Sequence, residues 1–307
     1  QPVGRFHLDE AELIPSRLHA LHELGVLDTP LDATLDQLAE LASWTFNVPQ
    51  VCVALADGDR VLVASLVMLL AFFLLALRLV ERPLFGVQRP WTPHITQFVC
   101  RSAFVILRLP IIVRGKPMRQ KGAVVANHAS WLDIFALNAA QRIYFVSKSE
   151  VASWPAIGWL ARATGTVFIN RKGTEAKAQQ EVFEARLRAG HRLCFFPEGT
   201  STDAIRVLPF KSSLFQAFYT HGLDRVLFIQ PVTVVYHAPP EKDPRFYGWW
   251  GNMEFGPHLL LTLAARRQGR VEVIFHPEVP VDAFPSRKEL AAHCERVIRT
   301  SHPLAEG

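Results

Sequence analysis

Cysteine is scarce in this chain of 307 residues, with only four copies, at Cys52, Cys100, Cys194 and Cys294. Their wide separation matches neither a zinc signature nor a disulfide framework, so we expect no metal site and a reducing compartment. Cys194 stands inside an apolar run, where we expect a buried free thiol. The chain also shows no internal repeat, no low-complexity tract and no nucleic-acid motif, which argues against repeat proteins and nucleic-acid partners.

Acidic residues are almost missing from one stretch of the chain. Between residues 78 and 121 there are nine Lys or Arg and a single acidic residue, Glu81. The first sixty residues have the opposite balance, with ten Asp or Glu against three Arg. Because an apolar run precedes the basic stretch, we interpret these cations as contacts to anionic phospholipid headgroups on the cytoplasmic side of a membrane.

The apolar run covers residues 61–77 and contains one Ser and no charge. A helix of this length spans about 25 Å, at the short end of what crossing a bilayer requires. Residues 92–109 are also mostly apolar, but His94, Gln97 and Arg101 interrupt them, which favours an interfacial helix or the return limb of a hairpin. We therefore expect residues 61–110 to form a membrane-inserting element, as a single span or as a hairpin, and a buried core helix is the alternative for residues 61–77.

Residues 1–60 have a separate character. Their pattern predicts amphipathic helices over residues 17–24 and 31–46 and a strand over residues 51–55. The phrases at 25–30, 35–42 and 48–60 resemble the opening of a GAF sensor domain, and they stop where most of that fold should begin. We interpret residues 1–60 as a partial GAF-like segment without a cyclic-nucleotide or haem pocket. A partner-docking arm is the alternative role.

From residue 111 onwards, short apolar runs alternate with longer amphipathic ones. The short runs predict strands over 111–113, 123–126, 143–146, 166–169, 193–196, 227–235 and 271–275. The longer runs predict helices over 131–140, 155–163, 175–189, 212–220 and 288–299. This alternation predicts an α/β domain over residues 111–307, with a central, mostly buried sheet flanked by helices.

A histidine and an aspartate stand five positions apart just after a predicted buried strand. His128 follows Asn127 at the end of that strand, and Asp133 falls on the next turn of helix. A neutral imidazole can take the proton of a hydroxyl that attacks a thioester, provided that a carboxylate orients its other nitrogen. The acceptor hydroxyl is itself the nucleophile, so no Ser or Cys is needed. We predict a catalytic pair, the alternative being a surface histidine beside a helix-capping aspartate.

A second landmark, Phe-Pro-Glu-Gly-Thr at 196–200, ends another apolar run. Gly199 permits a tight turn that approaches a ligand closely, whereas Glu198 can accept hydrogen bonds and Thr200 can donate them. An ordinary surface turn is the alternative. The two motifs in this order resemble the glycerolipid (lysophosphatidate-type) acyltransferase family, and their full phrases at 127–133 and 196–203 are most similar to bacterial lyso-ornithine lipid O-acyltransferases. The resemblance covers about residues 111–307.

The resemblance implies a membrane-bound O-acyltransferase without a bound cofactor or metal. Its co-substrate would be a fatty acyl thioester of acyl carrier protein or of coenzyme A, and its acceptor the 3-hydroxyl of an N-(3-hydroxyacyl)-amino acid lipid. The implied location is the bacterial inner membrane, with the catalytic domain on the cytoplasmic face. A 1-acyl-sn-glycerol-3-phosphate acyltransferase is the alternative, and a non-enzymatic membrane sensor or scaffold is a third possibility.

The resemblance also implies which residues bind substrate. They are Asn127, Arg171, Glu198, Gly199, Thr200 and Ser201. Arg206 and Lys211 are cations nearby, and we expect them to bind substrate as well. Members that use a glycerol-phosphate acceptor usually have Arg where this chain has Ser201, so one phosphate-binding cation is missing here. This difference favours an amino-acid headgroup over a phosphate.

Overall fold

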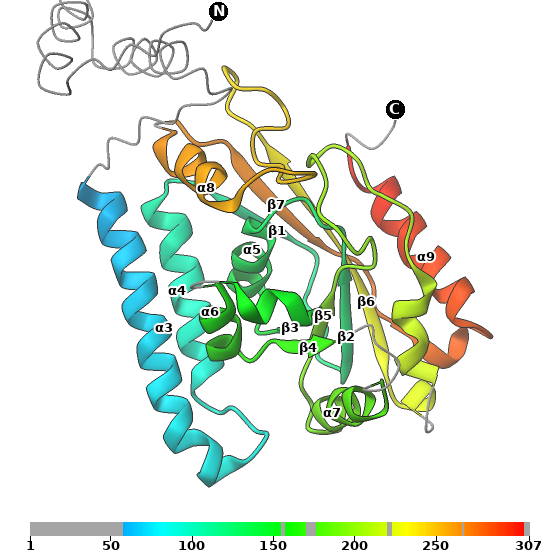
Figure 1. Ribbon diagram of the computed structural model, residues 1–307. Coiled ribbons are helices and arrows are strands. Elements are labelled where there is room, and N and C mark those ends of the chain that lie inside the picture. Colours follow the sequence, from blue (N-terminus) through cyan, green and yellow to red (C-terminus); the bar gives the residue numbers. More distant parts are fainter. Residues whose placement is uncertain (1–57, 155–156, 170–175, 220–222, 266, 304–307) are drawn as a thin grey trace, which may run out of the picture. The chain divides into compact units, whose positions relative to one another are not determined.

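The computed structural model describes residues 58–154, 157–169, 176–219, 223–265 and 267–303. Residues 56–307 form one compact unit, which contains all of the described elements (Figure 1). The helices and the strand predicted before residue 56 lie outside the described residues, and so does Arg171.

A mixed, mostly parallel sheet forms the centre of this unit. Its described strands are β1 (Ile111–Arg114), β2 (Gly122–Ala126), β3 (Tyr144–Lys148), β4 (Val167–Ile169), β5 (Leu193–Phe195), β6 (Phe228–His237), β7 (Arg270–Phe275) and β8 (Val279–Pro280). Their order is β1-β7-β6-β2-β5-β3-β4, and β8 pairs with β6 at one end of that strand. Among the described strand pairs, only those that β6 makes with β7 and β8 are antiparallel. The predicted α/β class is confirmed, together with all seven predicted strands, and β8 was not predicted.

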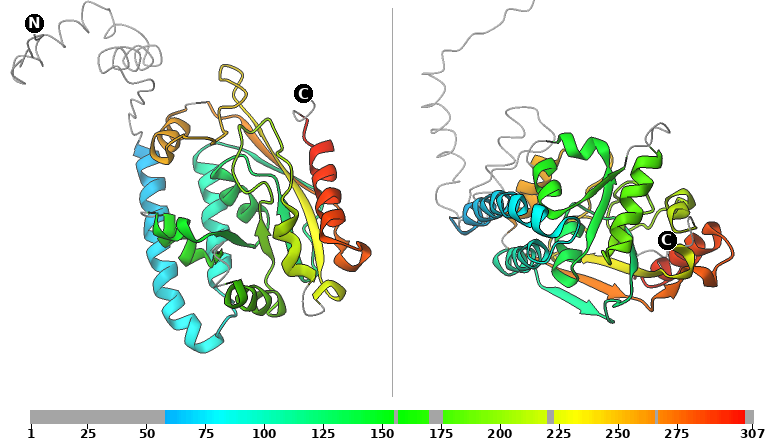
Figure 2. Two further views of the ribbon diagram at one scale, coloured as in Figure 1. Left: turned by 45° about the vertical axis from the view of Figure 1, so that its right-hand side comes forward. Right: turned by 90° about the horizontal axis from the view of Figure 1, so that it is seen from below.

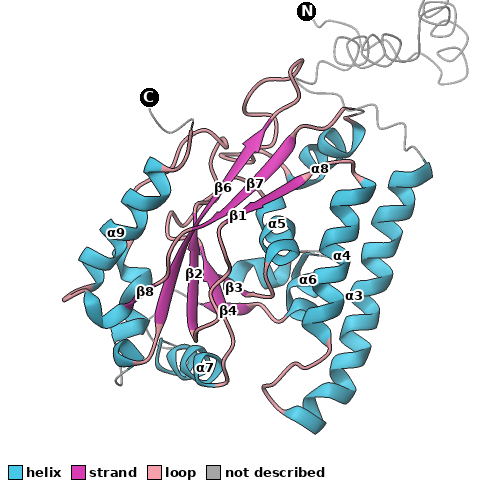
Figure 3. Ribbon diagram, turned by 180° about the vertical axis from the view of Figure 1, so that it is seen from behind, coloured by secondary structure: helices cyan, strands magenta, loops and turns pink. Residues whose placement is uncertain are grey.

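Helices cover both faces of the sheet. The described helices are α3 (Gly58–Phe85), α4 (Thr92–Ile106), α5 (Leu132–Ala140), α6 (Ile157–Thr164), α7 (Ala176–Arg188), α8 (Phe255–Ala264) and α9 (Arg287–Thr300). Figures 2 and 3 show α9 on one side of the molecule and the pair α3 and α4 on the other. The sequence did not predict α8.

The α-helix predicted over residues 212–220 was wrong in type. Ser212–Tyr219 forms a 3-10 helix, in which side chains three residues apart lie on one side. Phe215 and Phe218 have this spacing, and both are buried. The tighter helix therefore places both rings in the core.

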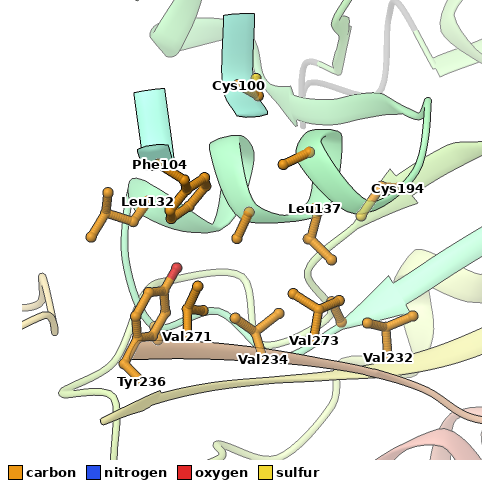
Figure 4. Packing of buried hydrophobic residues seen from close by; sticks show 14 of the residues in the cluster. Cys100, Phe104, Leu132, Leu137, Cys194, Val232, Val234, Tyr236, Val271 and Val273 are labelled. Carbon is orange, nitrogen blue, oxygen red and sulfur yellow. The ribbon is translucent and has the colours of Figure 1, made fainter. Parts of the chain in front are cut away.

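Strand β2 shows how the sheet separates two apolar cores. Val124 and Ala126 face a core built with α4, α5 and α8, whereas Ala123 and Val125 face a core built with α7, the 3-10 helix and α9. Successive residues of a strand point to opposite faces, so a strand that is covered on both sides is apolar throughout. Figure 4 shows the first core, where side chains of α4 and α5 meet those of β6 and β7. The site described below lies where β2 ends.

Helices α3 and α4 run side by side (Figures 1 and 3), and α3 also packs against α6. Glu81, the one acidic residue of the basic stretch, is fully buried and caps the start of α4. Its carboxylate accepts hydrogen bonds from the backbone N–H groups of Trp91 and Thr92, at 2.9 and 3.2 Å, and from the Thr92 hydroxyl at 3.0 Å. Within the part of the chain that the structure describes, no helix has both the length and the apolar character needed to cross a membrane.

Candidate active site

His128 and Asp133 meet at the carboxyl end of β2. The chain leaves the strand at Ala126, and α5 begins at Leu132, so the five-residue spacing turns the carboxylate back toward the imidazole. His128 Nδ1 lies 2.8 Å from Asp133 Oδ2. The Asp133 side chain is fully buried, whereas 19% of the His128 side chain remains exposed. The pairing therefore occupies Nδ1 and leaves Nε2 as the nitrogen for an incoming hydroxyl.

Asp133 is held by more than the histidine. Its Oδ2 also accepts the backbone N–H groups of Ala129 and Ser130, at 2.8 and 3.0 Å, and its Oδ1 accepts the hydroxyl of Tyr236 at 2.7 Å. The carboxylate thus caps the turn before α5 and orients the imidazole at the same time. Asp133 therefore caps this turn, and its contact with Nδ1 is the one that the predicted catalytic role requires.

Tyr236 was not among the predicted site residues. It lies near the end of β6 and is buried, with its hydroxyl directed toward α5 (Figure 4). Burial, together with the nearby Asp133 carboxylate, raises the pKa of Tyr236 well above its ordinary value. Its hydroxyl is therefore a permanent donor to Asp133. No local sequence signal marks this residue, because its contact depends on how β6 pairs with β2.

Glu198 holds the backbone of His128. Its Oε1 accepts the His128 N–H at 2.6 Å, and its Oε2 accepts the Leu208 N–H at 2.7 Å. Burial raises the pKa of Glu198 to about 8. Both carboxylate oxygens are engaged by the protein itself, so the structure gives Glu198 a positioning role at the base of the site.

Thr202 holds the backbone carbonyl of His128. Its N–H and its hydroxyl both donate to the His128 carbonyl oxygen, at 2.9 and 3.1 Å. The Phe196 ring lies against the imidazole, with centroids 4.0 Å apart and planes inclined by only 10°. The loop at 196–202 therefore orients His128 through both its backbone and its ring. Thr202 and Phe196 stand within the quoted motif but were not predicted as site residues.

Asn127 is directed into the sheet. Its amide Nδ2 donates to the Val234 carbonyl at 2.9 Å, and its Oδ1 accepts the Val234 N–H at 2.8 Å. The residue is buried, with both ends of the amide bound to β6. Asn127 therefore joins the end of β2, next to His128, to β6, which carries Tyr236. His128 and Tyr236 are the two side chains that bind Asp133.

The predicted turn at Gly199 lies beside a lysine. Gly199 has φ +75°, a conformation that glycine adopts readily, and a Cβ there would come 2.8 Å from Lys211 Nζ. The Lys211 N–H donates to Pro197 O at 2.9 Å, which holds the two segments together. Thr200 and Lys211 are exposed and Ser201 is half-buried, so this rim can meet a polar headgroup.

Arg206 forms an ion pair with Asp203. Its Nε donates to Asp203 Oδ2 at 2.8 Å, although most of its side chain is exposed. Burial would raise the pKa of Asp203, but hydrogen bonds from the backbone of Arg206 and Ile205 and the Arg206 charge lower it overall. Asp203 is thus an ionised turn residue paired with Arg206. Of the predicted cations, Lys211 lies nearest the Gly199 turn, and Arg171 falls outside the described residues.

A buried carboxylate thus orients a partly exposed imidazole beside a polar turn, an arrangement that suits acyl transfer to a hydroxyl. The model of the acyltransferase family matches residues 110–235, which include His128, Asp133 and the turn at 196–200. Over 226 residues the chain is 65% identical to a protein of Rhodobacter capsulatus named lyso-ornithine lipid O-acyltransferase, covering 74% of this chain and 82% of that one. The chain belongs to this acyltransferase family and is an enzyme of its class.

A second relative points to the same family. The chain is 34% identical over 215 residues to a Rhizobium meliloti protein of the same name, which covers 66% of this chain and 72% of the relative. A solved structure of a 1-acyl-sn-glycerophosphate acyltransferase from Thermotoga maritima covers 76% of this chain and 92% of its own, with 23% identity and a TM-score of 0.46.

Proposed function

We propose that the protein transfers a fatty acyl group from an acyl thioester to the hydroxyl of lyso-ornithine lipid. The observation that carries this proposal is the oriented His128–Asp133 pair in a chain 65% identical to a lyso-ornithine lipid O-acyltransferase. The donor is a thioester of acyl carrier protein or of coenzyme A, and no bound cofactor takes part.

The chemistry follows from the free nitrogen of His128. Nε2 takes the proton of the acceptor's 3-hydroxyl as its oxygen attacks the thioester carbonyl carbon. The carbonyl electrons move onto oxygen, return as the C–S bond breaks, and leave a new ester and a thiolate. The imidazolium then gives its proton to that thiolate, so the base is regenerated. Asp133 stabilises the imidazolium while it exists, and the Tyr236 hydroxyl keeps Asp133 in place.

The rim of the site suits a headgroup with a single carboxylate. Lys211 lies at the Gly199 turn, Ser201 takes the place where phosphate-using members have Arg, and Arg206 is paired with Asp203. A phosphate monoester carries close to two negative charges near neutral pH and favours several cations, arginine above all. The ornithine headgroup needs fewer, because its amine offsets its carboxylate.

One assay tests the acceptor. The purified enzyme is given one acyl donor and either lyso-ornithine lipid or lysophosphatidate, and ester formation is measured by mass spectrometry. We expect efficient acylation of lyso-ornithine lipid and poor acylation of lysophosphatidate. A clear preference for lysophosphatidate would replace the proposal by a 1-acyl-sn-glycerol-3-phosphate acyltransferase.

We also propose that the enzyme works at the cytoplasmic face of the bacterial inner membrane. Large apolar side chains on α3 stay exposed at helical spacing, which gives one apolar side: Leu69, Phe72, Phe73, Leu79 and Leu84. Trp159 of α6 extends this side, because its ring lies 5.7 Å from that of Phe72.

Flotation with phosphatidylglycerol vesicles tests the location. The variant with Phe73→Glu and Leu79→Glu should leave the vesicle fraction, whereas flotation equal to that of the unmodified protein would refute the surface.

A further inference from the structure

A basic pocket lies at the edge of the sheet opposite the catalytic histidine. It has a volume of about 380 Å³, and its cations are Lys116, Arg119, Arg142 and Arg192. None of the residues that line it is Asp or Glu. A small concave surface with four cations and no carboxylate favours an anionic group that can take several hydrogen bonds.

The sheet topology separates this pocket from the active site. Lys116 and Arg119 precede β2, Arg142 precedes β3, and Arg192 precedes β5, so the pocket lies at the amino ends of parallel strands. His128 follows the carboxyl end of β2. Since β2 has five residues, it alone separates the two by about 16 Å. The pocket is therefore a second site, and no part of the acceptor site.

An apolar groove adjoins the basic pocket. It has a volume of about 740 Å³, and its lining is mostly apolar and comes from α4, β1, the chain between them and the end of α5, including Phe104, Leu109 and Val113. Arg101 and Arg108 are the two cations in this lining. The groove and the basic pocket share Pro117 and Ala140, so one ligand can occupy both. Beside the groove, α4 exposes Phe98 at 67% and Val105 at 76%, two turns apart on one side of the helix.

We propose that this paired site holds one anionic phospholipid, with its phosphate headgroup in the basic pocket and an acyl chain in the groove. Clusters of Lys and Arg beside apolar surface attract anionic lipids, each cation adding to the affinity near a membrane surface. An acidic carrier protein would meet the same cations, but its thioester must reach His128 at the other end of the strand. The adjoining groove and the exposed apolar face of α4 also match a lipid better than a protein helix.

The test counts lipid molecules that stay on the protein. The full chain is incorporated into nanodiscs of phosphatidylglycerol or phosphatidylcholine, released gently, and examined by native mass spectrometry. We expect one phosphatidylglycerol to be retained and no phosphatidylcholine. Lys116→Gln with Arg119→Gln should weaken retention at low salt by about thirtyfold, since two surface cations are removed. Both residues are exposed, so folding should persist.

A matched control removes two exposed cations of α9, Lys288→Gln with Arg296→Gln, and should retain the lipid as the unmodified protein does. A third variant, Val113→Asp, places a charge in the groove and should also lose the lipid. Acyl transfer in detergent should stay unchanged in all three, so the result does not depend on the proposed reaction. Equal retention by the pocket variant and the control would overturn the proposal. The proposal would also be overturned if the pocket variant lost binding to acyl carrier protein but still retained phosphatidylglycerol.

Discussion

Tyr236 donates its hydroxyl hydrogen to Asp133 Oδ1 across 2.7 Å, although 103 residues separate the two in sequence. Asp133 in turn holds His128 Nδ1 with its other oxygen. A buried chain of hydrogen bonds therefore runs from β6 through the start of α5 to the imidazole. The orientation of the His128 imidazole therefore depends on β6, a strand distant from it in sequence.

Tyr236→Phe should slow turnover without abolishing it. The substitution keeps the ring and removes a hydrogen bond to a charged group, worth about 1.5 to 3 kcal/mol, so we expect kcat to fall about tenfold with KM little changed. Steady-state kinetics measures this effect. Tyr247→Phe is the matched control, because its hydroxyl bonds to Gln268 and Gly269 rather than to Asp133. If both variants keep full kcat, Tyr236 has no part in positioning the base.

His128→Ala should remove the reaction while the protein stays folded, because the change removes one ring that stacks on Phe196 and keeps the backbone hydrogen bonds of residue 128. Loss of a general base lowers rates by about a hundredfold to ten-thousandfold. Single-turnover acyl transfer gives the rate, and circular dichroism checks the fold. Near-normal turnover in this variant would refute the mechanism.

Asp133→Asn should be nearly as severe for a different reason. Asp133 accepts from four donors, and an amide would turn one acceptor into a donor. We expect a loss of about 1 to 3 kcal/mol in the free energy of unfolding, and a rate lowered about a hundredfold or more. Urea unfolding and kinetics on the same preparation separate the two effects. A variant that loses stability but keeps its rate would show that Asp133 only caps the turn.

Glu198 should make the protein less stable as the pH rises. Burial raises its pKa to about 8 from an ordinary value of 4.5, so the folded protein holds this proton more tightly than the unfolded chain. Its contribution is fully present below about 4.5 and is lost as the pH rises toward 8, by at most about 1.4 kcal/mol per pH unit. Urea unfolding at pH 5.5, 6.5 and 7.5 measures the slope.

Glu198→Gln should flatten that slope, because the group no longer titrates. It should also lower stability at pH 5.5 by about 1 to 3 kcal/mol, since its new N–H₂ faces the N–H of His128 or of Leu208. Glu241→Gln, at an exposed position, should leave the slope as it is. Identical slopes in the unmodified protein and in Glu198→Gln would contradict a proton held by Glu198.

Ser201→Arg should move the acceptor preference toward a phosphate. It restores the cation found in members that use a glycerol-phosphate acceptor, beside Lys211 and the Gly199 turn. The ratio of kcat/KM for lysophosphatidate to that for lyso-ornithine lipid should rise by up to about tenfold. Ser213→Arg adds the same charge at another exposed position and should leave the ratio unchanged. An equal rise in both variants would mean that overall charge, and not this turn, sets the preference.

The sequence predicted those parts of the fold and site that depend on nearby residues. The strands of the sheet are short apolar runs because both faces are covered, as the opposite packing of Val124 and Val125 shows. His128 and Asp133 are joined by one turn of chain, so their spacing was enough to predict their contact. Gly199 likewise has the turn conformation that its position in the motif predicted.

The contacts that were missed depend on strand order and register. Tyr236 reaches Asp133 only because β6 lies beside β2, with Ala126 opposite Val232, and no local pattern encodes that pairing. For the same reason the amide of Asn127 binds Val234 in the sheet, although its position in the motif suggested a substrate contact. Helix α8 was not predicted because its ten residues are mostly apolar, so its sequence shows little helical periodicity.

The hydrogen bonds between the loop at 196–202 and the backbone of His128 have a consequence for enzyme redesign. Glu198 binds the N–H of the histidine and Thr202 binds its carbonyl, so this loop supports the base as well as the rim of the acceptor site. Transplanting the loop alone from a relative with another acceptor would disturb catalysis before it changed specificity. In a mutational screen, positions 198 and 202 would score as inactive without touching a substrate. Grafts should therefore carry residues 127–133 and 196–208 together, as one inherited unit.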